Sequence, residues 1–151
     1  LAVGVLPLDD EGYTFLVGQH RFPGDYFSWE LPEGGGAMDE PAETSGAREL
    51  REETGLKASR WHRFLRMDLS NAISDEMAVG LIAWELEQFP PEPEDDEKII
   101  VRRVRFADAL EMAMSGEIID SFAQTMLFKA ELLATQGALP APVLERILAG
   151  R

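Results

Sequence analysis

Apolar residues near the start of the chain occur in short runs that are separated by turn-forming residues. Residues 1–8 and 13–19 are rich in Val, Leu, Phe and Tyr, and the polar segment 9–12 between them ends in glycine. Runs of this length with such a connection are typical of a β-hairpin. We therefore predict an opening hairpin, followed by a loop over residues 21–26 and a short strand over residues 28–31.

The pattern becomes helical after a glycine-rich break. Asp39 or Glu40 stands where a capping residue is expected, and Pro41 falls in the first turn. Gly55 follows the last turn. Proline near the start and glycine just beyond the end are common helix boundaries. The sequence therefore predicts a helix over residues 42–54.

The rest of the chain alternates between strand-like and helix-like segments. Strands are predicted over residues 60–68, 77–86 and 99–106, and helices over residues 107–114, 119–135 and 142–148. The apolar residues that share one face of the longest of these helices are Ile119, Phe122, Met126, Ala130 and Leu133. This order of elements predicts an α/β fold, a sandwich around a mixed β-sheet, in a single domain over residues 1–151.

The composition excludes several classes of protein. The chain has 151 residues and is 45% hydrophobic, which rules out a wholly disordered protein. Its formal net charge of −14 argues against a nucleic-acid partner or an anionic membrane, because both are themselves negative. The lack of cysteine excludes disulfides and zinc-thiolate sites. Since we find no membrane-spanning apolar run and no basic signal-peptide lead, we expect a cytoplasmic protein.

Part of the acidic excess gathers on the predicted helix over residues 42–54. Glu49, Glu52 and Glu53 stand at positions i, i+3 and i+4, so their carboxylates share one face. Three like charges on one face repel one another. One interpretation is a solvated surface helped by Arg48 and Arg51. The other is a site for a hard cation such as Mg²⁺, which prefers carboxylate oxygens.

The spacing around this helix resembles a known signature. Gly34 is followed after five residues by Glu40, and after seven more by the run Arg-Glu-Leu-Arg-Glu-Glu-Thr-Gly-Leu at residues 48–56. This matches every defined position of the Nudix box, G-x5-E-x7-R-E-U-x-E-E-x-G-U, in which U is a bulky aliphatic residue. The resemblance implies an α/β/α sandwich that hydrolyses a nucleoside diphosphate linked to another moiety, X.

The resemblance also implies roles for individual residues. Divalent ions, Mg²⁺ or Mn²⁺, would neutralise the diphosphate and activate a water molecule. The residues that match the family's metal ligands are Glu49, Glu52 and Glu53, together with the backbone carbonyl of Glu33. Arg48 matches the arginine that orients the box glutamates, and we assign it, with Glu52, to the catalytic set. Gly34 shapes the loop and is assigned to the substrate-binding set.

The flanking segments resemble the ADP-ribose pyrophosphatase branch of this family. That branch has a Q-x-R and an E-[LF]-P before the box, which here are residues 19–21 and 30–32, and a similar stretch at 116–120. The resemblance implies that Arg21 and Glu30 bind substrate, and that ADP-ribose is converted to AMP and ribose 5-phosphate. Three aromatic residues near these segments are candidates either for packing or for stacking a base: Phe22, Tyr26 and Trp29.

The general base is left open by the sequence. In this branch the acidic loop before the last strand supplies a mobile glutamate. Glu97 is the nearest match, Asp95 is the next, and a box glutamate is the third alternative. The segment 70–72 departs from the proline-containing turn that the branch usually has, which leaves the exact sugar nucleotide open.

Other substrates and one other function also remain open. The alternatives are another nucleoside diphosphate sugar, NADH, or a non-catalytic Nudix module that senses a nucleotide. In every case the expected partner is a small nucleoside diphosphate derivative, and no nucleic acid or membrane is expected. The branch often has an N-terminal β-region that swaps across a homodimer. The chain begins at the first core strand, so that region is either outside this sequence or missing, and a homodimer is an expectation from resemblance alone.

Overall fold

The computed structural model describes residues 1–90 and 98–151, and it contains two β-sheets and four α-helices within those ranges. The strands are β1 (Ala2–Pro7), β2 (Tyr13–Arg21), β3 (Tyr26–Glu30), β4 (Glu33–Gly35), β5 (Leu56–Asp68), β6 (Met77–Gln88) and β7 (Ile100–Arg105). A short 3-10 helix, Phe22–Gly24, joins β2 to β3. The α-helices are α1 (Ala42–Thr54), α2 (Phe106–Ser115), α3 (Ser121–Thr135) and α4 (Ala141–Ala149).

The larger sheet is mixed, as predicted, and has the strand order β4-β1-β6-β5. β1 runs parallel to β6 and antiparallel to β4, and β5 runs antiparallel to β6. The smaller sheet is antiparallel and has the order β3-β2-β7. The α/β class and the mixed sheet are therefore confirmed.

The predicted opening hairpin is wrong, although both of its strands and its turn exist. The turn is held by Asp9, whose carboxylate accepts hydrogen bonds from the backbone of Glu11 (3.0 Å) and Tyr13 (2.9 Å). The strands that it joins belong to different sheets. Almost every residue of β1 is buried, because it is a central strand with a sheet neighbour on each side and helices on both faces. A short apolar run does not reveal which partner will pair with it.

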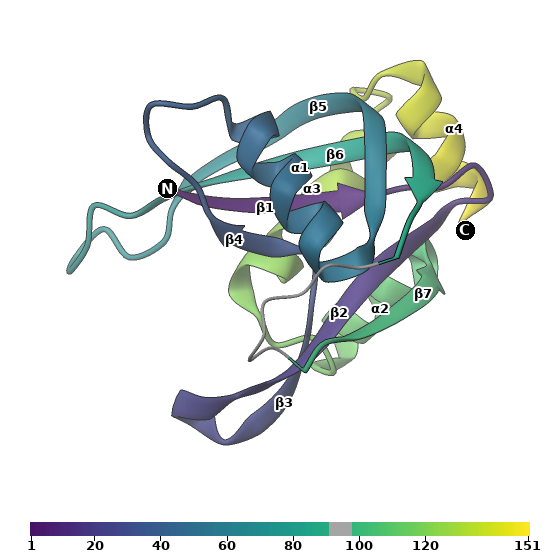
Figure 1. The fold of residues 1–151 in the computed structure, drawn as a ribbon. Coiled ribbons are helices and arrows are strands. Elements are labelled where there is room, and N and C mark those ends of the chain that lie inside the picture. The colour runs from purple at the N-terminus through teal and green to yellow at the C-terminus, as the bar shows by residue number, and fades with distance from the viewer. Residues whose placement is uncertain (91–97) are drawn as a thin grey trace.

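Helices cover both faces of the mixed sheet, as Figure 1 shows, with α1 in front and α3 behind. On the α1 side, Leu50 packs in a buried cluster with Val5 of β1. On the α3 side, Leu6 belongs to the large core cluster that includes Met126 and Leu127. Successive residues of β1 thus pack against opposite helical layers. None of the helices in the described ranges has the length and apolar character needed to cross a membrane.

One predicted helix cap and one predicted helix start need correction. The helix α1 begins at Ala42 as predicted, but no side chain among residues 1–90 and 98–151 caps it; its N-cap residue is Pro41, and the carboxylate of Glu40 accepts instead from the hydroxyl of Ser45. The second case is α3, which begins at Ser121, so Ile119 lies outside the helix and is exposed. Asp120 caps this helix by accepting a hydrogen bond from the backbone N–H of Ala123 at 2.6 Å. Because Asp120 caps the first turn, α3 begins after Ile119, although the apolar pattern in the sequence already includes that residue.

Candidate active site

A close contact between a glycine and a glutamate joins the box helix to the sheet. Glu49 is only 8% exposed and lies against Gly34 of β4. A Cβ atom added at Gly34 would lie 2.2 Å from the carboxylate carbon of Glu49, which is far inside van der Waals contact. Only glycine leaves room there for the carboxylate. The glycine of the box therefore has a packing role that depends on a specific acid.

Arg48 holds the glutamates of α1 in place. Its Nη1 donates to Oε1 of Glu49 at 2.7 Å and lies 3.6 Å from Oε2 of Glu52. Its Nη2 donates to the backbone carbonyl of Gly35 at 2.7 Å. One guanidinium therefore links two acidic side chains to β4. This is the geometry that an orienting residue requires.

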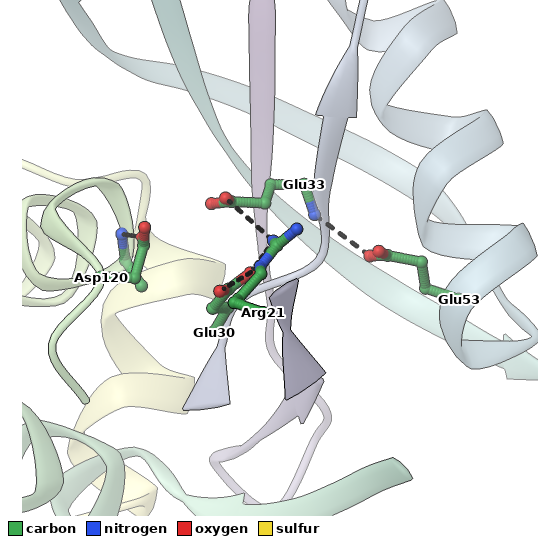
Figure 2. A network of polar contacts seen from close by, with 6 residues as sticks. Arg21, Glu30, Glu33, Glu53 and Asp120 are labelled. Atoms are coloured by element: carbon green, nitrogen blue, oxygen red, sulfur yellow. Dashed lines mark hydrogen bonds and ion pairs between the residues drawn. The ribbon is translucent and has the colours of Figure 1, made fainter. Parts of the chain in front are cut away.

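Glu53 reaches the sheet at the neighbouring residue of β4. Its Oε2 accepts a hydrogen bond from the backbone N–H of Glu33 at 3.1 Å, and its side chain is almost fully buried. The carboxylate of Glu33 points away from Glu53, as Figure 2 shows. Sequence reasoning assigned the carbonyl of Glu33 to a metal, whereas the contacts seen here involve its N–H and its side chain.

The carboxyl group of Glu33 is electrostatically unusual. Burial raises its pKa to about 9, and the negative charges of Asp120 and Glu30 contribute to the shift. Its Oε2 atom is buried and has no hydrogen-bond partner among the residues that the structure describes. An acid in this setting holds its proton near neutral pH unless a cation approaches.

These side chains surround a polar cavity of about 380 Å³, which we call the glutamate cavity. Its lining residues are Gln19, Arg21, Glu33, Gly34, Gly35, Arg48, Glu49, Glu52 and Glu53. Among residues 1–90 and 98–151, no three acidic or histidine side chains already converge as the ligands of one ion. The donor set nevertheless fits a hard divalent cation, because four carboxylates line one cavity and Gly34 leaves room for the carboxylate of Glu49.

Arg21 and Glu30 form a pair on the opposite wall. Nε of Arg21 donates to Oε1 of Glu30 at 2.8 Å, and Nη2 donates to Oε2. Glu30 is 3% exposed, so this carboxylate is committed to Arg21. The hydrogen bond to Glu30 holds the pKa of Arg21 above its usual value. The pair uses one edge of the guanidinium, and the Nη1 group lies outside it.

Arg21 and Glu33 border two further cavities beside the glutamate cavity. The α3 cavity, of about 430 Å³, is lined by Ala2, Arg21, Glu33, Gly34, Gly35, Leu69, Glu76, Asp120, Ser121 and Phe122. The hairpin cavity, of about 380 Å³, is lined by Arg21, Pro23, Gly24, Tyr26, Glu30, Glu33 and Asp120. Three cavities therefore meet at one arginine and one glutamate.

Asp120 borders two of these cavities and was missed as a functional candidate. Burial raises its pKa, and the charge of Glu30 contributes, while the hydrogen bond from the backbone of Ala123 opposes the shift. Its signals in the sequence are its place before an amphipathic helix and its position at the end of the stretch 116–120, which resembles the ADP-ribose pyrophosphatase branch. Neither signal indicates that Arg21 will lie nearby.

The remaining predicted candidates are the two acids proposed as the general base and the three aromatic residues. Glu97 and Asp95 lie outside the described residues. Trp29 packs edge-on against Phe27 with ring centroids 5.3 Å apart, and Arg102 covers its ring. Tyr26 lines the hairpin cavity, whereas Phe22 is 91% exposed.

Comparison with known proteins identifies the family of this chain. The family described as NUDIX domain matches residues 1–123. The chain is 31% identical over 147 residues to an ADP-ribose pyrophosphatase of Mycobacterium tuberculosis, which covers 94% of this chain and 70% of that protein. It is 34% identical over 122 residues to an ADP-ribose pyrophosphatase of Bacillus subtilis, covering 80% and 66%. The crystal structure of an ADP compounds hydrolase shares the fold with a TM-score of 0.80 at 19% identity, covering 91% of this chain and 75% of that one.

Proposed function

The chain belongs to the NUDIX domain family, and from this we propose that it is a pyrophosphohydrolase that converts ADP-ribose to AMP and ribose 5-phosphate with Mg²⁺ or Mn²⁺. Two relatives that are over 30% identical and are named ADP-ribose pyrophosphatase support the substrate. The observation that carries the proposal is the seating of Glu49 against Gly34. It places the acidic face of α1 at the wall of a cavity that also contains Arg21.

The chain's own residues can do most of the positioning. Glu49, Glu52, Glu53 and the carbonyl of Glu33 would hold the divalent ions, which supply charge neutralisation and a more acidic water when bound. Arg48 keeps two of these glutamates in register. Arg21, held by Glu30, offers its remaining donors to a phosphate oxygen.

In the reaction, a water oxygen bonds to one phosphorus and the bridging P–O bond breaks. The proton of the water passes to a carboxylate, and the leaving phosphate takes the bridging oxygen. The acceptor is Glu97, Asp95 or a box glutamate such as Glu52. Because the catalytic glutamates and Arg48 are all present in this chain, catalysis is favoured over a module that only senses a nucleotide.

We also propose the class of partner, the location and the oligomeric state. The net charge of −14 supports a small nucleotide partner over a nucleic acid. The acidic, cysteine-free composition supports a cytoplasmic location. A homodimer follows only from the resemblance to the ADP-ribose pyrophosphatase branch.

A substrate panel tests the proposal. Purified protein is incubated with ADP-ribose, other nucleoside diphosphate sugars and NADH, with Mg²⁺ or Mn²⁺ and with EDTA as control. We expect AMP and ribose 5-phosphate from ADP-ribose, with no turnover in EDTA. A folded protein that hydrolyses none of these compounds would overturn the proposal. Faster turnover of another compound would transfer the assignment to that substrate.

A further inference from the structure

The α3 cavity lies beside the glutamate cavity, and the proposed metal chemistry does not use it. The two cavities share Arg21 and residues 33–35, so a diphosphate bound at Arg21 would extend one of its ends into the α3 cavity. We propose that this cavity binds the X group of the substrate as a neutral, hydroxyl-rich sugar, an inference that rests on the function proposed above. Asp120 and Glu76 are its hydroxyl acceptors and its specificity-determining residues.

The lining of the cavity matches a sugar better than a base. Leu69 and Phe122 supply apolar surface, and Asp120 and Glu76 supply carboxylates. Ionised carboxylates only accept hydrogen bonds, so they suit the hydroxyl donors of a sugar. Adenine has one exocyclic amino donor and its unsubstituted ring nitrogens are acceptors, so it offers these two carboxylates fewer donors than a sugar with several hydroxyl groups.

Asp120 and the backbone of Glu76 are held by local structure. Asp120 is fixed by its hydrogen bond from the backbone of Ala123 at the start of α3. Glu76 ends the segment between β5 and β6, and its backbone carbonyl accepts from the N–H of Leu69 at 3.1 Å. This bond closes the segment at its base and keeps Leu69 and Glu76 on the same edge of the cavity. The Asp120 carboxylate is therefore in place before a ligand arrives, and the exposed side chain of Glu76 extends from a fixed backbone.

The charge balance of the cavity also restricts X. Arg21 is the one cation among the described residues that line it, and Glu30 already pairs with that arginine. The other ionisable groups of the lining are the carboxyl groups of Glu33, Glu76 and Asp120. Even with Glu33 protonated, a phosphate added to the sugar of X would lie near the carboxyl groups of Glu76 and Asp120, and no further cation among the described lining residues would balance it. The cavity should therefore favour ADP-ribose over a derivative phosphorylated on the terminal ribose.

The hairpin cavity shares Arg21, Glu33 and Asp120 with the α3 cavity but differs in its apolar side chains. Tyr26 of β3 and Pro23 of the connection between β2 and β3 line it next to Arg21. An aromatic ring beside a guanidinium provides stacking surface for a flat base. The two ends of the substrate would thus separate at Arg21, with the sugar towards α3 and the nucleoside towards the hairpin.

The test uses Asp120→Asn and Glu76→Gln, singly and together. Asparagine still caps a helix, and Glu76 lies outside any helix or strand, so the fold should be kept. Each change should lower kcat/KM for ADP-ribose about tenfold, mainly through KM, the size of a hydrogen bond to a charged group. For the ethyl ester of ADP, whose X group has no hydroxyl, kcat/KM should change less than about threefold. The double variant Asp108→Asn/Glu111→Gln on the exposed side of α2 is the charge-matched control.

Two further measurements distinguish the outcomes. Binding of ribose 5-phosphate should weaken about tenfold in Asp120→Asn while binding of AMP stays the same. The double variant of Asp120 and Glu76 should show a higher ratio of kcat/KM for ADP-ribose phosphorylated on its terminal ribose to kcat/KM for ADP-ribose than the wild type does. Equal losses on ADP-ribose and the ethyl ester, or weaker binding of AMP alone, would overturn the inference. If the wild type hydrolyses none of the compounds, the proposed function fails, and the ribose 5-phosphate arm still decides this inference.

Discussion

Two acidic regions of this molecule handle their charge in different ways. On α1, the acids stand on one helix and share a counter-ion, Arg48, from the same helix. In the cluster of Arg21, Glu30, Glu33 and Asp120, the side chains come from β2, β3, β4 and the start of α3, as Figure 2 shows. The first region places carboxylates where a cation can join them. The second surrounds one cation with acids, and burial raises the pKa values of Glu33 and Asp120.

The comparison teaches that similar residue types serve different purposes according to burial and partner. The acids of α1 border an open polar cavity, so a metal ion can offset their repulsion. Glu30 is closed off by its arginine and can act on a substrate only through it. Substitutions in the two regions should therefore affect different measurable quantities.

The largest effect is expected at Glu53. Glu53→Gln should lower kcat at least about a hundredfold, because it removes a charge that the metal ions require. Glu52→Gln should act similarly. Glu145→Gln, on the exposed face of α4, is the control and should leave kcat unchanged. A loss below threefold at both box positions would show that the glutamate cavity is not the active site.

The next effect concerns the space that Gly34 leaves for Glu49. Gly34→Ala should lower kcat/KM on the order of ten- to a hundredfold and cost about 1–3 kcal/mol of unfolding free energy, because the new methyl displaces the carboxylate. Gly35→Ala is a close control, since a Cβ there meets nothing within 4 Å. Steady-state kinetics and urea unfolding measure both effects. Equal behaviour of the two variants would contradict the packing argument.

A smaller effect tests the second region. Glu30→Gln should raise KM for ADP-ribose about tenfold with a lesser change in kcat, because Arg21 loses a charged partner and its fixed direction. Glu117→Gln breaks an ion pair with Arg102 that is about half exposed and should change KM little. A fall in kcat at constant KM would instead place Glu30 in the chemical step.

The smallest effect is on the pH dependence of stability. The pKa of Glu33 is about 9 in the folded protein and near 4.5 in the unfolded chain, so the folded state holds this proton more tightly. Its contribution to stability is complete below about pH 4.5 and is lost as pH rises towards 9. Glu33→Gln should therefore gain stability relative to the wild type by about 1 kcal/mol for each pH unit between pH 5 and pH 8.

Urea unfolding in EDTA measures this difference, because a bound metal would change the titration. The raised pKa of Asp120 should leave part of the wild-type slope in the variant. If the two proteins keep a constant difference across this range, Glu33 is not the titrating group.

The sequence alone determined the parts of this protein that depend on neighbours along the chain. The shared face of Glu49, Glu52 and Glu53 follows from the helical period, and the helix ends at Gly55 because its φ of 76° suits glycine. Helix and strand positions were mostly recovered for the same reason. Each signal lies within a few residues of the element that it predicts.

Only the tertiary structure decided the contacts between segments that are distant in the sequence. It placed β1 between β4 and β6, where an apolar run had suggested a hairpin with β2. It closed Glu30 onto Arg21 and brought Asp120 to the same cluster. Strand pairing and the burial of charge depend on register and packing across the whole fold, so no local pattern could specify them.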